Sequence, residues 1–280
     1  MIEINHFEEI TQIRMSRASH GNPPYWVSAY YVDGLLIDTG CSDTAEELAE
    51  FLESQKLDLV VNTHHHEDHI GGNELIGRRF GVEILAHPDS LPMIDRPPLP
   101  PPYRERVWGS PPASDVSPIP RKIVTNRYRF DVIDTPGHCP GHIALVEKSR
   151  GWCFSGDLYV GEKIKVCGPE HDVGEMVTSM NRLLCVDTDR LVLFTAMRTI
   201  EPNGRRALRS GIKYFEEMSR HARDLYRDGF TVEGIVDELL GGESVFDRIT
   251  KGQYSSANLV RLLLSADFEE VRSDSENAAS

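Results

Sequence analysis

Residues 61–72 read Val-Asn-Thr-His-His-His-Glu-Asp-His-Ile-Gly-Gly, and we expect the rest of the chain to be built around them. Four imidazoles and two carboxylates occupy the six consecutive positions from His64 to His69. Imidazole nitrogen and carboxylate oxygen together suit zinc, iron or manganese. The sequence therefore predicts a metal site here, and we call residues 62–72 the metal loop.

The flanking residues place this cluster at the end of a strand. The mainly apolar segment 57–61 is typical of a buried strand, and Gly71-Gly72 precedes a short helix predicted over 73–79. Ligands in a loop that leaves a strand can converge on one ion. A surface tract of histidines or an expression tag is the alternative, but this cluster is internal and contains an acid.

The spacing His-x-His-x-Asp-His is held by His64, His66, Asp68 and His69, and it resembles the signature of the metallo-β-lactamase superfamily. The resemblance implies a metal-dependent hydrolase. It also implies the four-layer αββα sandwich of that family, which is an α/β fold. Within the family, the nearest expectation is the glyoxalase II-like branch.

Two further motifs follow in the order in which the family has them, each after an apolar strand: Thr135-Pro136-Gly137-His138 and Ser155-Gly156-Asp157. The resemblance implies that His138 is the third imidazole on a first metal. It implies that Asp157 bridges to a second metal, and that Asp38 of Asp38-Thr39-Gly40 lies beneath the metal loop and supports it. A loop aspartate that caps the next helix is the alternative for Asp38. We interpret His142 as structural or as support for a ligand.

One family ligand is missing from its expected place. A dinuclear member carries a histidine just past the strand predicted over 191–194, whereas this chain has Thr195-Ala196-Met197. His171 is the unassigned histidine in that part of the sequence, so it is a candidate replacement ligand. The alternatives are that His171 binds an anionic group of the substrate at a helix N-terminus, or that it is simply exposed.

The alternation of strand and helix patterns predicts a catalytic domain over residues 1–203, opened by strands at 2–7, 11–18, 25–32 and 35–38 with turns at 21–24 and 33–34. Helices are predicted at 204–227, 231–240 and 255–266, within a C-terminal helical part over 204–268. Residues 269–280 are polar, which predicts a flexible tail. Strands are also expected at 82–86, 123–133, 142–147 and 151–155.

The segment 91–120 interrupts this alternation, because it holds ten of the 17 prolines in the chain. Such a density predicts no regular structure, with polyproline II over 97–102. One interpretation is a lid over the metal site. A docking surface for a partner or second subunit and an insertion without function are the alternatives.

Composition limits the partners. The formal net charge of −14 argues against a protein that grips many phosphates of a nucleic acid. No apolar run approaches the roughly 20 residues that a bilayer requires. The N-terminus lacks a basic region followed by an apolar segment, and this favours a cytoplasmic enzyme of small molecules. The sequence does not determine the oligomeric state, and a homodimer is one expectation.

The ligand pattern predicts the chemistry. His64, His66 and His138 would hold one zinc tightly and lower the pKa of its water to about 7, which generates a hydroxide for attack on an ester, thioester, lactone or phosphoester. Asp68, His69 and Asp157 would hold a second, weaker zinc, or Asp68 would act as a general acid and base. The alternatives are a mononuclear iron oxygenase of the persulfide dioxygenase type, with His64, His138 and Asp157 as the iron ligands, and a non-catalytic binding or sensing domain.

Overall fold

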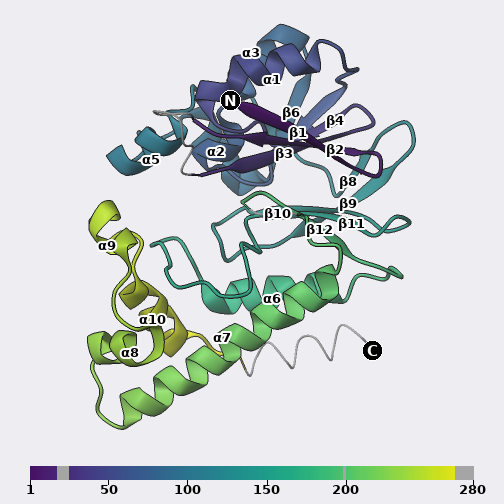
Figure 1. Ribbon diagram of the computed structural model, residues 1–280. Helices are drawn as coiled ribbons and strands as arrows, with labels where there is room; N and C mark the ends of the chain where they lie inside the picture. Colours follow the sequence, from purple (N-terminus) through teal and green to yellow (C-terminus); the bar gives the residue numbers. More distant parts are fainter. Residues whose placement is uncertain (18–24, 198–199, 269–280) are drawn as a thin grey trace. The chain divides into compact units, whose positions relative to one another are not determined.

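A computed structural model describes residues 1–17, 25–197 and 200–268 of the chain (Figure 1). They divide into two compact units: the first holds 1–134, 141–157 and 191–202, and the second holds the remainder. The predicted turn at 21–24 and the predicted tail at 269–280 lie outside the described residues. The predicted catalytic domain over 1–203 concerns function as well as packing, and it stays a prediction.

The first sheet of unit 1 has seven strands in the order of the sequence. They are β1 (Ile2–Phe7), β2 (Ile10–Met15), β3 (Val27–Val32), β4 (Leu35–Ile37), β5 (Leu59–Val61), β6 (Glu83–Ala86) and β7 (Ser117–Pro118). Strands β1 to β4 pair antiparallel, and β4 to β7 pair parallel. The predicted opening meander is confirmed. Asp33 and Gly34 join β3 to β4 with φ of 50° and 86°, the positive values that a tight hairpin turn requires.

The second sheet of unit 1 has five strands in the order β12-β11-β10-β9-β8. They are β8 (Lys122–Val124), β9 (Arg129–Asp134), β10 (Ile143–Glu147), β11 (Trp152–Gly156) and β12 (Val192–Thr195). The single strand predicted over 123–133 is wrong, because a turn divides it. In that turn the amide of Thr125 donates to the carbonyl of Tyr128, and the Thr125 hydroxyl accepts from the amide of Tyr128.

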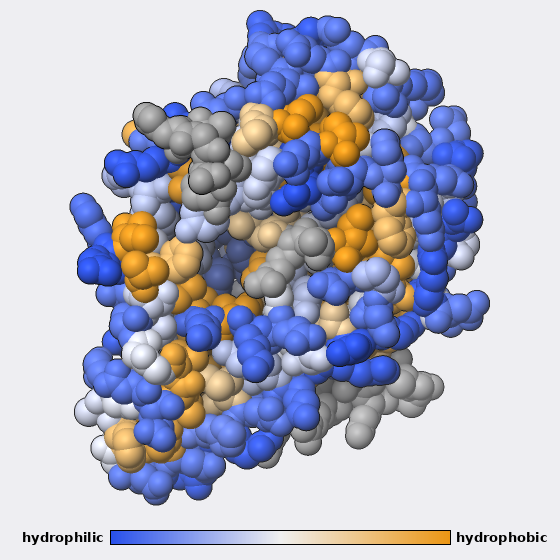
Figure 2. Space-filling view, viewed as in Figure 1, coloured by the Kyte–Doolittle hydropathy of each residue, from blue (hydrophilic) through white to orange (hydrophobic). Residues whose placement is uncertain are grey.

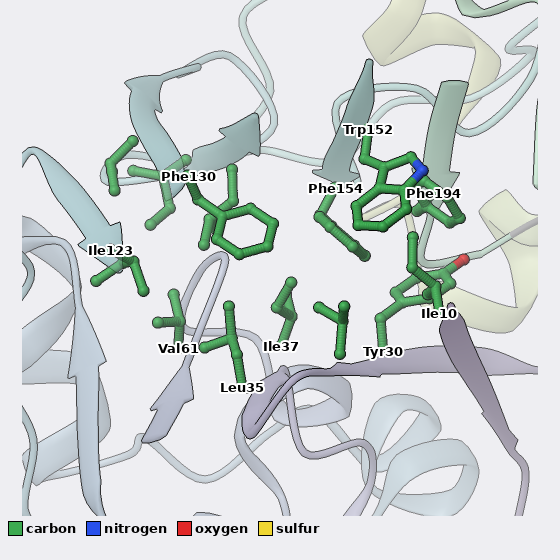
Figure 3. Close-up of a cluster of buried hydrophobic side chains, with 14 of the residues drawn as sticks. Ile10, Tyr30, Leu35, Ile37, Val61, Ile123, Phe130, Trp152, Phe154 and Phe194 are labelled. Carbon is green, nitrogen blue, oxygen red and sulfur yellow. The ribbon is translucent and has the colours of Figure 1, made fainter. Parts of the chain in front are cut away.

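The main hydrophobic core lies between these two sheets. Figure 3 shows the labelled side chains of the two sheets facing one another: Ile10, Tyr30, Leu35, Ile37 and Val61 from the first, and Ile123, Phe130, Trp152, Phe154 and Phe194 from the second. The rings of Phe154 and Phe194 are stacked with centroids 4.8 Å apart. Burial of this apolar surface holds the two sheets together.

Helices cover the outer face of the first sheet (Figure 1). The helix α1 (Ala45–Leu52) contributes Leu48 and Leu52, and α3 (Asn73–Phe80) contributes Ile76, to a second core cluster with strand residues such as Leu36. Unit 1 therefore stacks helices, a sheet and a second sheet. This mixed arrangement confirms the predicted α/β fold class, and the solved structure reported below shares it.

The proline-rich segment is more regular than its composition predicted. It contains the helices α4 (Leu91–Asp95) and α5 (Pro102–Trp108) and the strand β7, preceded by the 3₁₀ turn η2 (Pro88–Ser90). The prediction of no regular structure over 91–120 is wrong, and polyproline II cannot extend to Pro102. Pro92 and Pro102 stand in the first turn of α4 and α5, where a missing amide hydrogen costs nothing.

Unit 2 is helical. Its helices are α6 (Val173–Leu184), α7 (Gly204–Arg227), α8 (Val232–Leu240), α9 (Val245–Thr250) and α10 (Ser256–Ser265). The three predicted C-terminal helices are confirmed, and α9 was not predicted. Figure 2 shows apolar surface over α9, where Val245 and Ile249 are each about half exposed. No helix among the described residues is both long and apolar enough to cross a membrane.

Candidate metal centre

The metal loop is one short helical turn held by its surroundings. It leaves β5 and forms α2 (Glu67–Ile70), where the amide of His69 donates to the carbonyl of His66 at 2.9 Å. A helix of four residues is not stable alone. Its shape therefore depends on the tertiary contacts that hold both ends.

A buried amide pair holds the end of this turn. Asn73 Nδ2 donates to Asn62 Oδ1 at 2.8 Å, and Asn62 Nδ2 donates to Asn73 Oδ1 at 3.1 Å. Asn62 Nδ2 also lies 3.2 Å from the carbonyl of His69, and the Thr39 hydroxyl lies 3.1 Å from the same carbonyl. These roles of Thr39, Asn62 and Asn73 were not predicted from the sequence. The only signal was that polar side chains flank a buried strand and begin a helix.

Asp38 supports the loop from β4, as the resemblance implied. Its Oδ1 accepts from the amide of Thr63 at 2.7 Å, and its Oδ2 lies 2.8 Å from both the Thr63 hydroxyl and His69 Nδ1. The φ of Asp38 is 62°, a left-handed conformation that is uncommon for residues other than glycine. The surrounding contacts stabilise this conformation, and Asp38 is 3% exposed.

Two imidazoles in the loop approach one another closely. His64 Nε2 and His66 Nδ1 lie 3.1 Å apart, and His64 Nδ1 lies 3.1 Å from the Thr63 hydroxyl. Two nitrogens that bind one tetrahedral zinc at about 2.0–2.1 Å each are about 3.3 Å apart. The separation of these two nitrogens therefore fits a shared cation.

A second set of donors lies around His69. Its Nε2 is buried, makes no hydrogen bond within the described part of the chain, and lies 3.7 Å from both Asp68 Oδ2 and Asp157 Oδ2. One ligand atom each of His64, His69 and Asp157 lies within 4.8 Å of the others, and all three residues are buried. A buried donor atom that faces two carboxylates fits a divalent cation. This chemistry supports a metal-binding group of His and Asp residues in unit 1.

Burial and neighbouring charges shift the pKa values of the ionisable groups in this site. Burial lowers the pKa of His69, but the carboxylates of Asp38, Asp68 and Asp157 outweigh it and raise this pKa well above its usual value. Burial raises the pKa of Asp68 to about 7. Burial also acts to raise the pKa of Asp157, but the charge of His69 outweighs it and lowers this pKa. These carboxylates therefore favour the protonated form of the His69 imidazole.

His142 fixes the backbone that carries Asp157. The amide of Asp157 donates to His142 Nε2 at 3.1 Å, and the ring centroids of His142 and His64 lie 5.0 Å apart. A Cβ added to Gly156 would lie 2.6 Å from His142 Nε2, so only glycine fits here. This agrees with the interpretation of His142 as structural or as support for a ligand.

The end of β12 has alanine where the resemblance implied a metal ligand. The amide of Ala196 donates to the carbonyl of Gly156 at 3.1 Å, and its carbonyl accepts from the amide of Ser28 at 2.8 Å. Ala196 is buried in the second core cluster of unit 1. This backbone is therefore ordered and connected to the loop of Asp157, but its side chain offers no donor.

The remaining candidates, His138 and His171, lie in unit 2, and their ring centroids are 5.0 Å apart. The amide of Asp172 donates to the carbonyl of Gly137 at 2.7 Å, which connects the two loops. Asp172 accepts from the amide of Glu175 and so caps α6. The roles of His138 as a ligand and of His171 as a ligand or substrate contact stay predictions.

Residues 24–193 match the family model of the metallo-beta-lactamase superfamily. The chain is 32% identical over 173 residues to a hydroxyacylglutathione hydrolase of Rhodospirillum rubrum, covering 60% of this chain and 58% of that protein. It is 30% identical over 135 residues to the probable metallo-hydrolase YybB of Bacillus subtilis, covering 47% of this chain and 59% of YybB. The matched region thus spans little more than half the length of these relatives.

A solved structure of a beta-lactamase domain protein from Burkholderia ambifaria is also similar. It has a TM-score of 0.70 at 14% identity, and the match covers 93% of this chain and 86% of that chain. At this identity the likeness establishes the fold and nothing about activity.

Proposed function

The chain belongs to the metallo-beta-lactamase superfamily, and from this we infer that it is a metal-dependent hydrolase whose centre is the metal loop. One observation carries the proposal: the buried Nε2 of His69 faces the carboxylates of Asp68 and Asp157 at 3.7 Å and has no hydrogen-bond partner within the described residues. A divalent cation satisfies all three groups at once.

The donors divide into two sets. His64 and His66, joined by His138, would hold a first cation, and Asp68, His69 and Asp157 would hold a second. We propose zinc for the first position, because nitrogen donors predominate there. The missing histidine at Ala196 leaves the second set one ligand short, so this cation is bound more weakly. Bound there, a divalent cation would supply Lewis acidity and lower the pKa of a water molecule.

The protein residues have separate tasks. Asp38 fixes the ring of His69, and His142 fixes the backbone of Asp157. Asp68 is a buried carboxyl group beside His69. In this position its Oδ atom could accept a proton and return it to the leaving group.

The proposed substrate class is a small thioester. Support comes from the relatives, because the Rhodospirillum rubrum protein is named a hydroxyacylglutathione hydrolase and such an enzyme cleaves a thioester of glutathione. The acidic chain favours a small molecule over a nucleic acid as substrate. Esters, lactones and phosphoesters belong to the same panel, because each presents an electrophilic carbon or phosphorus atom to a hydroxide nucleophile.

The test is hydrolysis of that panel by the zinc-loaded wild-type chain and by His66→Ala. We expect thioester hydrolysis in the wild-type chain and its loss in His66→Ala. His6→Ala is the matched control, because His6 is an exposed imidazole of β1, and it should retain activity. Zinc binding without hydrolysis of any panel member would refute the hydrolase and favour a non-catalytic binding domain.

A second candidate function has one observation in its favour. The sequence suggested His64, His138 and Asp157 as the iron ligands. The group of His64, His69 and Asp157 also has two imidazoles and one carboxylate, the composition of a mononuclear iron oxygenase site. Expression without added metal distinguishes the two functions. Iron in the purified chain, together with oxygen uptake that requires a thiol, would replace the hydrolase proposal with an oxygenase of the persulfide dioxygenase type.

A further inference from the structure

The proline-rich segment contacts the metal loop through an ion pair. Arg104 in α5 donates from Nε to Glu67 Oε1, and Glu67 stands between His66 and Asp68 in the sequence. The side chains of Arg104 and Glu67 are only 15% and 8% exposed. Removing one partner of a buried pair leaves an uncompensated charge. The pair therefore determines where Glu67 lies.

The position of Glu67 determines the position of its neighbours. Successive residues of an α-helix project about 100° apart, so Glu67 can contact α5 while Asp68 lies beside His69. The amide pair of Asn62 and Asn73 holds the end of this turn through the carbonyl of His69. Arg104 acts at its beginning, on the first residue of α2.

The helix α5 is itself well attached to unit 1. Trp108 is 8% exposed, and its ring packs against that of Tyr25 in a tilted arrangement with centroids 6.1 Å apart. The Ser42 hydroxyl lies 3.4 Å from the carbonyl of Trp108, and Arg17 Nη1 lies 2.8 Å from the carbonyl of Glu105. Because these contacts hold α5 in place, Arg104 can restrain the position of the metal loop.

We propose that Arg104 is a positioning residue of the metal centre: through Glu67, it holds the turn from which His66 and Asp68 reach the metal. This inference rests on the proposed function, because it concerns the same site. It also gives part of the proline-rich segment a task, since this segment supplies the arginine.

The experiment is a zinc titration of the metal-free chain, followed by calorimetry. We expect Arg104→Met to bind zinc about 10–100-fold more weakly, the range for partners that orient metal ligands. Arg106→Met is the matched control, because Arg106 is an exposed arginine of the same helix. It should bind zinc as the wild-type chain does. Equal zinc affinities of Arg104→Met and Arg106→Met would overturn the proposal.

A second pair of variants covers the case in which Arg104→Met does not fold. Glu67→Gln keeps an oxygen that accepts from Arg104, whereas Glu67→Leu does not. We expect Glu67→Leu to bind zinc at least about tenfold more weakly than Glu67→Gln, and Arg104→Lys to retain part of the affinity that Arg104→Met loses. Equal binding by the two Glu67 variants would overturn the proposal as well.

The same titration separates this inference from the proposed function. If the wild-type chain binds no zinc, both fail. If it binds zinc and cleaves thioesters while the Arg104 and Glu67 variants bind zinc equally well, only the role of Arg104 fails. Circular dichroism of each variant confirms that the fold is retained.

Discussion

Asp38 Oδ2 lies 2.8 Å from His69 Nδ1, and this contact sets the chemistry of the imidazole. Because an ionised carboxylate only accepts hydrogen bonds, Nδ1 carries the hydrogen and Nε2 is directed at Asp68 and Asp157. A histidine that binds a metal commonly donates its other N–H to a carboxylate in this way. In the proposed centre, Asp38 would therefore orient His69 as a ligand.

This relationship predicts the effect of Asp38→Asn. The asparagine tolerates the left-handed backbone, but its amide group can turn an N–H toward His69 Nδ1 and favour the tautomer with hydrogen on Nε2. We expect metal binding to weaken by about 10–100-fold, measured by titration of the metal-free chain. Asp33→Asn is the control, because Asp33 has φ of 50° in a remote hairpin. Unchanged affinity in Asp38→Asn would contradict this role.

The amide pair predicts a loss of stability. Asn73→Ala leaves the fully buried amide group of Asn62 without its partner, which costs about 1–3 kcal/mol in the free energy of unfolding. Urea denaturation of the metal-free chain measures this. Asn5→Ala, at an exposed position of β1, should change the free energy by less than about 0.5 kcal/mol. Equal stability of the two variants would show that the pair contributes nothing.

Metal binding should release protons. Because the carboxylates raise the pKa of His69, its imidazole is protonated near pH 7 in the metal-free chain, and a cation must displace that proton. We expect proton release on zinc binding at pH 7, measured by calorimetry in buffers of different ionisation enthalpy. As the pH falls below about 6, the other imidazoles also take up protons, so zinc and activity are lost. Full zinc occupancy at about pH 4 would be incompatible with imidazole ligands.

The two donor sets should differ in affinity. In the proposed centre, His64, His66 and His138 would offer three nitrogens, whereas the second set would lack the histidine that the family resemblance implied near Ala196. We expect one tightly bound metal per chain after dialysis and a second that binds only when metal is added. Elemental analysis counts them. Two equally tight ions would point to a replacement ligand, with His171 as the first candidate to substitute.

The sequence predicted the fold well where local patterns decide it. The loop of His64 follows a buried strand and precedes a helix as expected, because apolar periodicity and paired glycines mark both. The meander that opens unit 1 was predictable because Asp33-Gly34 requires a tight turn. The ligand spacing resembled that of a known family, and this resemblance implied the fold class.

Long-range contacts were not predictable in the same way. The density of prolines over 91–120 predicted an irregular chain, yet two helices form there. Pro92 and Pro102 do not prevent them, because both stand in a first turn, where proline is tolerated. The pairing of Arg104 with Glu67 joins residues 37 positions apart, and no local pattern signals it. The sequence indicated a supporting role for His142, but its bond to the amide of Asp157 exists only in the folded chain and was not predicted.

Thioester hydrolysis by the chain, stripped of metal with a chelator and then titrated with zinc, tests the central claim most directly. The account predicts no hydrolysis in the stripped chain and recovery that rises with zinc until the site of His64 and His66 is filled. Hydrolysis that persists at full rate after every metal ion has been removed would contradict it.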